Sequence, residues 1–182
     1  MTIHGEHPFA DAGGEKDPAR RLRGRLAGRV TLWTSGATAR SPDRAGLTMS
    51  SVMVATGDPA ELLGLVDPDS ALGESLEVGS PLAVTVLDWS HRQLADAFAG
   101  LTPAPGGPWR LTSWRGEDHP PVPHDASAYA LAEVVDLQEV GWSTLVRARL
   151  DHLSVREDAE HDPAELVHHR GRYRRLAPPG GS

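Results

Sequence analysis

Hydrophobic and polar positions alternate with a period of two along much of this chain, a pattern typical of β-strands. The alternation, or a run of β-branched and apolar residues, predicts strands over 29–34, 46–55, 61–66, 81–87, 129–137 and 142–155. A last extended segment is expected over 166–176. The strands over 129–137 and 142–155 are close enough to form a hairpin around Val140-Gly141.

Helical spacing is confined to short stretches. Asp17-Pro18 offers an N-cap and a first-turn proline for a basic helix ending near Ala27, before Gly28. Two more helices are expected over 71–77 and from Asp88 or Ser90 to just before Gly100. Six or seven strands with two or three short helices predict a mainly β fold. We expect an antiparallel sheet closed into a barrel, because closure removes exposed strand edges.

The length of 182 residues is that of one domain. We expect disordered ends over 1–16 and 177–182, and a single folded domain over 17–176. Residues 102–125 contain six prolines and three glycines. A connection this long is usually a functional element, such as a lid, or a disordered linker.

Composition narrows the classes of function. The chain has no cysteine, which excludes disulfides, thiolate metal sites and cysteine nucleophiles. The net charge of −7 argues against nucleic acid as a partner. No apolar run approaches the ~18 residues of a membrane span, and the N-terminus lacks signal-peptide order, so a soluble, cytoplasmic protein is expected. The nine histidines lack metallohydrolase spacing, and no metal site is predicted.

Charge is distributed unevenly along the chain. Residues 1–45 carry eight basic and five acidic side chains, and residues 168–182 carry four basic and none acidic. The section between them is strongly acidic. The basic ends are able to pair with each other, with a second subunit or with a small anionic ligand, and simple solvation is the remaining alternative.

The densest group of hydroxyls within a predicted strand is Thr48-Met49-Ser50-Ser51. On an ideal strand Thr48 and Ser50 share one face, with Met49 and Ser51 on the other. Hydroxyls among apolar neighbours need hydrogen-bond acceptors, and a phosphate or a ribityl chain would meet that need. An ordinary strand end is the structural alternative.

A second polar group, Asp67-Pro68-Asp69-Ser70, joins a predicted strand to a predicted helix. The N-terminus of a helix presents free N–H groups and a partial positive charge, which suit a phosphate. The two aspartates favour an ordinary capped turn instead.

Several motifs follow one another in an order that resembles the flavin reductase-like family, which has an FMN-binding split β-barrel. The likeness covers roughly Leu26 to Leu176. The motifs are Gly46-Leu47-Thr48-Met49-Ser50-Ser51, Asp58-Pro59, Gly64-Leu65-Val66-Asp67 with Ser70, Ala83-Val84-Thr85-Val86-Leu87, Gln93-Leu94-Ala95-Asp96-Ala97-Phe98 and His169-Arg170-Gly171-Arg172-Tyr173-Arg174.

The resemblance implies a homodimer with FMN, or alternatively FAD, at the subunit interface. It implies hydride transfer from NADH or NADPH to the flavin, with reduced flavin passed to a monooxygenase. Because the cofactors carry that reaction, no catalytic side chain is assigned. Carried over by position, the flavin-contacting residues would be Thr48, Met49, Ser50 and Ser51, then Asp67, Pro68, Asp69 and Ser70 over the phosphate, and Phe98, His169, Arg172 and Tyr173 nearby. Arg40 and Arg44 lie close enough in sequence to add positive charge.

The chain departs from the family pattern before its penultimate strand. Many members carry glycine–aspartate–histidine there, with the histidine linked to nicotinamide binding, whereas this chain has Val140-Gly141-Trp142-Ser143. We expect Trp142 to pack in the barrel, with stacking on a cofactor ring as the alternative. Two other functions therefore stay open: a flavin or deazaflavin binder without NAD(P)H turnover, and a binding module in which residues 48–51 are purely structural.

Overall fold

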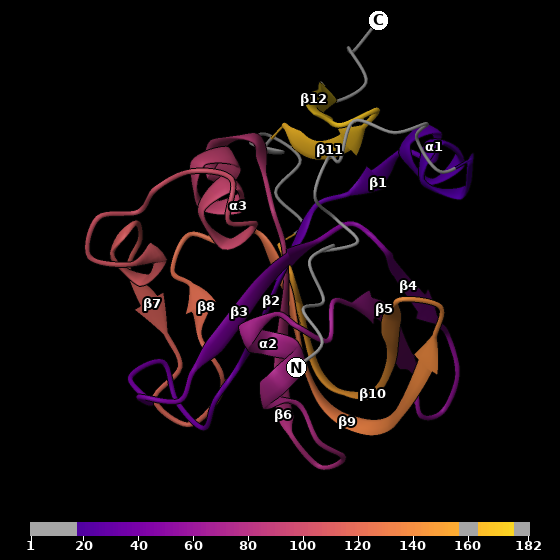
Figure 1. Cartoon of the computed structure of the whole chain (residues 1–182). Helices are drawn as coiled ribbons and strands as arrows, with labels where there is room; N and C mark the ends of the chain where they lie inside the picture. The colour runs from indigo at the N-terminus through magenta and orange to yellow at the C-terminus, as the bar shows by residue number, and fades with distance from the viewer. Residues whose placement is uncertain (1–17, 157–163, 177–182) are drawn as a thin grey trace, which may run out of the picture.

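The structure is a computed structural model that describes residues 18–156 and 164–176. The ends expected to be disordered, 1–16 and 177–182, lie outside this range, as does Asp17. Seven strands form one antiparallel sheet, shown in Figure 1. In spatial order these are β3 (Ala45–Met49), β2 (Thr31–Ser35), β6 (Pro81–Val86), β9 (Ala128–Val140), β10 (Ser143–Val155), β5 (Glu61–Val66) and β4 (Val52–Ala55). The mainly β prediction is confirmed.

In the described part of the chain the sheet is curled into a half-barrel whose two edge strands do not pair with each other, so the expected closure is incomplete (Figure 1). Its edge strands, β3 and β4, are consecutive in sequence and are joined only by Ser50 and Ser51. The amide of Leu65 on β5 donates to the Ser51 carbonyl at 3.2 Å, which ties the connection to the second edge. Register shifts between β9 and β10 help the long hairpin to bend. The prediction of one strand over 46–55 was therefore wrong, because the chain leaves β3 after Met49 and starts a new strand on the opposite edge.

The interior of the curl is filled around Trp33, which is completely buried on β2. Its indole N–H donates to the Thr31 hydroxyl at 3.1 Å, and that hydroxyl donates to the Met49 carbonyl, also at 3.1 Å. A Cβ added at Gly64 would lie 2.6 Å from two atoms of the Trp33 ring. Glycine at position 64 thus lets β5 pass directly under the indole.

Short helices lie close to their expected positions: α1 (Pro18–Arg25), α2 (Ala71–Ser75) and α3 (Arg92–Phe98), with a 3₁₀ turn η1 (Trp89–His91) leading into α3. At the end of α3, Gly100 has φ +68°, and the Leu101 amide donates to the Asp96 carbonyl at 2.9 Å. This is the glycine-terminated helix end that the sequence predicted. Helix α3 covers a second core cluster that contains Leu32, Leu87 and Leu94.

The proline-rich stretch 102–125 is folded rather than an unstructured linker. It contains a 3₁₀ turn η2 (Pro108–Arg110) and a small two-stranded sheet of β7 (Trp114–Arg115) and β8 (Val122–Pro123). The ring centroids of Trp109 and Trp114 lie 4.8 and 5.9 Å from that of Phe98. These contacts anchor the stretch against α3 beside β3.

The C-terminal segment forms a hairpin instead of one extended segment. β11 (Glu165–His169) and β12 (Arg172–Leu176) pair across a turn at Arg170 and Gly171, and β11 also pairs with β1 (Gly28–Arg29). Arg29 forms ion pairs with Glu165 on β11 and with buried Asp88, which accepts a hydrogen bond from Ser127 at 2.8 Å. These contacts hold the hairpin over the Ser50–Ser51 connection. Across the residues that the structure describes, none of the helices has the length and apolar character needed to span a membrane.

Candidate functional site

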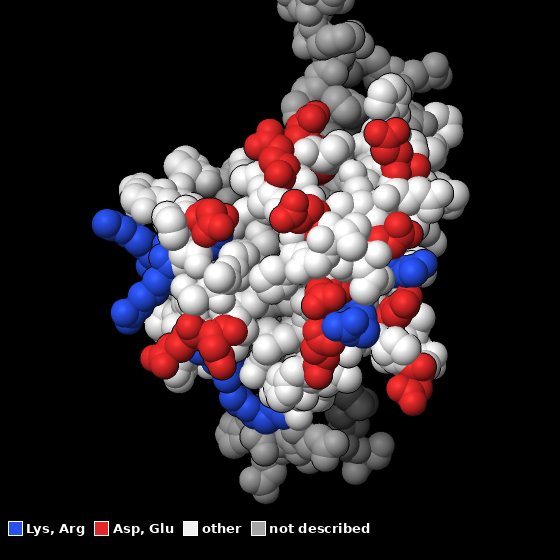
Figure 2. All heavy atoms as spheres, turned by 90° about the horizontal axis from the view of Figure 1, so that it is seen from below, with Lys and Arg blue, Asp and Glu red and all other residues white. Residues whose placement is uncertain are grey.

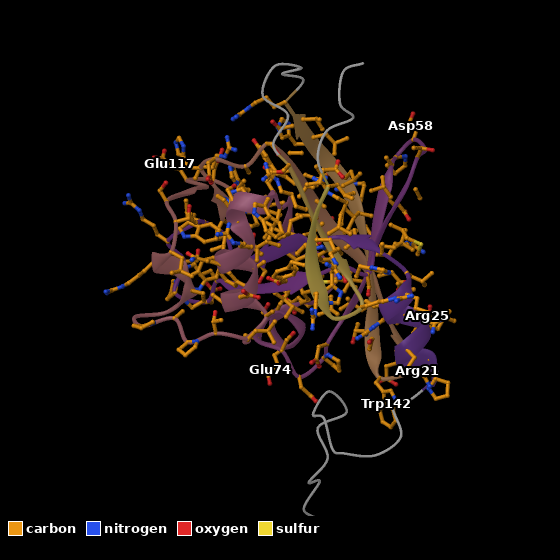
Figure 3. The ribbon with its side chains drawn as sticks, turned by 90° about the horizontal axis from the view of Figure 1, so that it is seen from above. Arg21, Arg25, Asp58, Glu74, Glu117 and Trp142 are labelled. Carbon is orange, nitrogen blue, oxygen red and sulfur yellow. The ribbon has the colours of Figure 1, made fainter. Side chains whose placement is uncertain are left out.

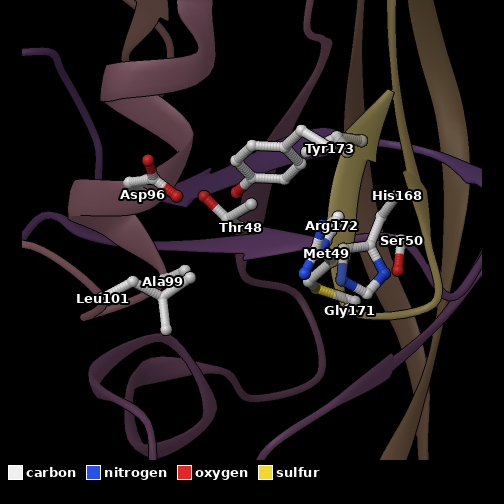
Figure 4. Close-up of a pocket in the computed structure, with 11 residues that line it drawn as sticks. Thr48, Met49, Ser50, Asp96, Ala99, Leu101, His168, Gly171, Arg172 and Tyr173 are labelled. Atoms are coloured by element: carbon white, nitrogen blue, oxygen red, sulfur yellow. The ribbon is translucent and has the colours of Figure 1, made fainter. Parts of the chain in front are cut away.

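Two adjoining cavities, of about 440 and 410 Å³, lie between the curled sheet, α3 and the β11–β12 hairpin. We call them the first and second cavity, and together the groove. The first is bordered by α3 and β12, and the second by α1, β5 and the start of β10. Figure 4 shows the first cavity. Both are lined by Thr48, Met49, Ser50, His168 and Gly171.

The hydroxyls of Ser50 and Ser51 are available to a ligand. Both residues sit where the chain crosses from one sheet edge to the other, and neither belongs to a strand. Ser50 lines both cavities and Ser51 lines the second. Within the described residues, neither hydroxyl makes a hydrogen bond to the protein. They retain their full donor and acceptor capacity at the centre of the groove.

Thr48 is more constrained than the serines. Its hydroxyl donates to the Ala95 carbonyl of α3 at 2.8 Å and so ties the helix to β3. Only its lone pairs remain for a ligand, which would have to be a donor. Met49, Val30, Ala99 and Leu101 give the first cavity an apolar wall suited to a planar ring.

Tyr173 and Asp96 form a hydrogen-bonded pair at one end of the first cavity. Burial raises the pKa of Tyr173 to about 12, and the charge of Asp96 and the hydrogen bond to it act in the same direction. The phenol is therefore protonated throughout the physiological range and donates to the carboxylate.

Positive charge in the groove comes from arginines. Arg23 of α1 lines the second cavity and Arg172 of β12 lines the first. Burial lowers the pKa of His168, and the charges of Arg23 and His169 lower it further. Its imidazole is therefore neutral at pH 7 and serves as a hydrogen-bonding group.

The basic segments gather at one end of the molecule. The Arg170 amide donates to the Gly24 carbonyl at 2.7 Å, which joins the β11–β12 turn to arginine-rich α1. Figure 2 shows many acidic side chains on the face seen from below, away from this end. An anionic ligand is thus favoured at the groove over the opposite face.

The structure brings part of the predicted site together. Of the candidates that the sequence singles out, seven line the groove: Thr48, Met49, Ser50, Ser51, Asp67, Arg172 and Tyr173. Five line neither cavity: Pro68, Asp69, Ser70, Phe98 and His169. Their contacts with a cofactor stay predictions.

Ser70 and Asp67 are occupied in local structure. The Ser70 hydroxyl accepts from the Gly73 amide at 3.0 Å and donates to the Asp67 carbonyl at 2.6 Å, as an N-cap of α2. The Asp67 carboxylate accepts from the Asp69 amide at 3.0 Å. These bonds match the capped-turn alternative.

Phe98 and Arg44 are held elsewhere in the protein. The Phe98 ring is buried against Gly46 and the two tryptophans of the proline-rich stretch. Arg44, expected to add charge near the hydroxyls, stacks over Trp109 at 4.9 Å and donates to the Ala39 carbonyl at 3.0 Å. Neither Arg44 nor Arg40 lines the groove.

The expectation that Trp142 packs in the barrel was wrong. The residue lies in the turn between β9 and β10 and is 77% exposed. Figure 3 places it at the margin of the molecule, on the same side as Arg21 and Arg25 of α1. Its neighbour Ser143 lines the second cavity, so the turn forms part of that cavity's rim.

Sequence reasoning missed Arg23, Asp96 and His168 as lining residues. Asp96 lies within a motif whose periodic apolar residues drew attention to the helix core instead. Arg23 belongs to a helix far from residues 48–51 in sequence, and the β1–β11 pairing and the Arg170–Gly24 hydrogen bond bring it to the groove. Among the described residues no cluster of three or more His, Asp or Glu side chains is placed to hold a metal ion.

Comparison with known proteins agrees with this architecture. Residues 23–177 match the family model described as the flavin reductase like domain. The chain is 28% identical over 143 residues to the 4-hydroxyphenylacetate 3-monooxygenase reductase component of Pseudomonas aeruginosa, covering 78% of this chain and 82% of that protein.

Two solved structures share the fold. Flavin reductase PheA2 in its native state superposes with a TM-score of 0.76 at 22% identity, covering 91% of this chain and 100% of PheA2. The NADH:FAD oxidoreductase SgcE6 of Streptomyces globisporus C-1027, in complex with NAD and FAD fragments, also gives a TM-score of 0.76. Its identity is 23%, with 90% of this chain and 93% of that one covered.

Proposed function

The chain belongs to the flavin reductase-like family, and from that premise we propose that it transfers hydride from NADH or NADPH to a flavin bound in the groove. The observation that carries the proposal is the meeting of two cavities at Ser50, whose hydroxyl and that of Ser51 make no hydrogen bond to the described protein. Two reacting partners need two adjoining spaces, and the groove provides them.

The residues present fit an FMN molecule. The Ser50 and Ser51 hydroxyls are able to donate to phosphate or ribityl oxygens of the flavin, with positive charge from Arg23 in the second cavity. Arg172 in the first cavity is left to the phosphates of the nucleotide. The Thr48 hydroxyl would accept a hydrogen bond from the ligand, because its own proton is already donated to the Ala95 carbonyl. FMN is the proposed flavin and FAD the alternative.

Hydride exchange is chemistry that the flavin and nicotinamide supply when bound. The task of the chain is to hold the two rings in contact and to exclude water. The apolar wall of Met49, Val30, Ala99 and Leu101 serves both purposes. The neutral imidazole of His168, shared by both cavities, is placed to hydrogen-bond either partner.

A homodimer with the flavin at its interface is part of the proposal. β4 is an edge strand that directly follows Ser51, and it exposes Met53 at 65% and Val54 at 60%. A second copy of the chain that paired with β4 or covered it would bury these side chains, and it would add a further wall to the groove. Because the relative from Pseudomonas aeruginosa is the reductase component of a monooxygenase, we propose a monooxygenase as the acceptor of reduced flavin. The cytoplasm is the proposed location.

The turn between β9 and β10 favours a second candidate function. Exposed Trp142 stands where many family members carry the histidine linked with nicotinamide binding. A flavin or deazaflavin binder without NAD(P)H turnover would not need that histidine.

Oxidation of NADH and of NADPH by the purified protein with added FMN or FAD separates the two functions. Reductase activity predicts nucleotide oxidation well above that of a matched sample without protein. Binding of flavin without oxidation of either nucleotide would contradict the reductase proposal and support the second candidate. Failure to bind any flavin would leave only a structural role for residues 48–51.

A further inference from the structure

The two ends of the first cavity differ in charge. Asp96 of α3 lies at one end beside Tyr173 and Thr48, while Arg172 and Ser50 lie toward the other, as Figure 4 shows. The adenosine half of a dinucleotide, in which a ribose with free hydroxyls is followed by a diphosphate, matches this arrangement. The same half with a further phosphate on the ribose does not.

Asp96 is held firmly in place. The carbonyl of its neighbour Ala95 accepts the Thr48 hydrogen bond at 2.8 Å, and its own carbonyl accepts from the Leu101 amide at 2.9 Å. Its carboxylate accepts from the Tyr173 phenol. The backbone at Asp96 is thus fixed, and the carboxylate lies beside the phenol of Tyr173.

The charge of Asp96 is not cancelled by a cation. In the described ranges, no arginine, lysine or histidine forms an ion pair with it, and Tyr173 is a neutral donor. A carboxylate has room for about four hydrogen bonds, so Asp96 has acceptor capacity left for a ligand in the cavity. The negative charge of the Asp96 carboxylate therefore acts directly on a ligand bound at the Asp96 end of the cavity.

NADH and NADPH differ only in a phosphate on the 2′-oxygen of the adenosine ribose. A carboxylate accepts hydrogen bonds from free ribose hydroxyls, as acidic residues do in other dinucleotide sites, and it repels a phosphate at the same oxygen. We propose that Asp96 is a specificity-determining residue that selects NADH over NADPH. This inference rests on the proposed reductase function, because it assigns the ribose of the nucleotide to the Asp96 end of the first cavity.

The test compares wild type with Asp96→Asn. Asparagine keeps the size of the side chain and an oxygen that accepts from Tyr173, and it removes the charge. We expect wild type to prefer NADH, and the ratio of kcat/KM for NADPH to that for NADH to rise at least about tenfold in the variant, mainly through the KM for NADPH. Calorimetric titration of the flavin-free protein with NADP⁺ and NAD⁺ should show the same shift in affinity without any turnover.

Glu74→Gln is the matched control. Glu74 is an exposed acid on α2 that lines neither cavity, so the same loss of one negative charge should leave the ratio unchanged. Figure 3 shows Glu74 on the periphery of the molecule. An equal shift in this control would mean that overall charge, not Asp96, sets the preference, and would overturn the inference.

A measurement on the wild type covers the case in which Asp96→Asn fails to fold. Salt screens like-charge repulsion at a partly exposed carboxylate, so the NADPH to NADH ratio should rise with ionic strength. A wild type that prefers NADPH, or a folded variant with an unchanged ratio, overturns the assignment while the reductase function stands. Absence of flavin reduction with either nucleotide overturns the proposed function itself, and the inference with it.

Discussion

Replacing Ser50 and Ser51 together by alanine should separate ligand binding from folding. Neither hydroxyl has a hydrogen-bond partner in the described protein, so the double variant leaves no buried group unsatisfied. We expect its free energy of unfolding to stay within about 0.5 kcal/mol of wild type, as for other surface substitutions.

The effect on flavin affinity should be much larger. A hydrogen bond to a charged group is worth about 1.5–3 kcal/mol, and about 1.4 kcal/mol corresponds to tenfold in Kd. Even if only one of the two hydroxyls reaches the phosphate, Kd for FMN should rise at least about tenfold. Because the wild-type hydroxyls lose no internal bond on binding, the full loss appears in the affinity.

Ser70→Ala is the matched comparison, because its hydroxyl is fully engaged in capping α2. Loss of an N-cap costs about 1 kcal/mol, which lowers Tm by about 2–4 °C in a chain of this size. We expect FMN affinity to be unchanged. A Ser70 variant that binds flavin poorly would instead support the phosphate contact that the sequence predicts.

Quenching of flavin fluorescence on titration gives Kd, and thermal unfolding gives Tm, for all three proteins. A double variant that binds FMN as tightly as wild type would refute a contact between these hydroxyls and the flavin. Unfolding of the double variant several degrees lower would contradict their availability to a ligand, because the hydroxyls would then have partners that the structure does not contain.

Two further predictions concern stability. Gly64→Ala places a methyl group 2.6 Å from the ring of fully buried Trp33. This overpacking should lower the free energy of unfolding, measured by denaturant titration, by about 1–3 kcal/mol. An unchanged denaturation midpoint would mean that β5 shifts away from the indole. The pKa of Tyr173 is raised to about 12 from its ordinary value of 10.0, so the unfolded chain loses this proton first as pH rises. The contribution of Tyr173 to stability is therefore complete below pH 10 and is lost on the way to about pH 12. Tyr173→Phe should flatten that part of the stability–pH curve, and an identical curve for the variant would contradict the raised pKa that burial and Asp96 give Tyr173.

The sequence was sufficient to predict most of the fold because local signals and global architecture agree. The strand predicted over 61–66 is β5, the apolar and β-branched run over 81–87 contains β6, and Gly100 marked the end of α3. The break at Ser50–Ser51 escaped notice because β3 and β4 both alternate, and nothing local reveals that they pair with opposite edges of one sheet. That break is a consequence of long-range pairing.

The site was harder to predict from the sequence, because it too depends on contacts between distant parts of the chain. Thr48, Ser50 and Ser51 stood out as hydroxyls among apolar residues, and the groove forms around them. The family resemblance pointed to His169, whereas its neighbour His168 lines the groove. Adjacent side chains of a strand lie on opposite faces, and the sequence does not say which face is covered. Trp142 was expected to pack in the barrel, but a tight turn at Gly141, with φ +59°, carries it outside the sheet.

Reduction of a flavin by a nicotinamide nucleotide within the groove is the property on which the other functional assignments depend. The most direct test mixes the protein with one equivalent of FMN under anaerobic conditions and then adds NADH while the visible absorbance of the flavin is followed. We predict rapid bleaching in wild type and much slower bleaching in the Ser50→Ala/Ser51→Ala variant at the same concentrations. Flavin that binds but stays oxidised, or bleaching at equal rates in both proteins, would contradict the account.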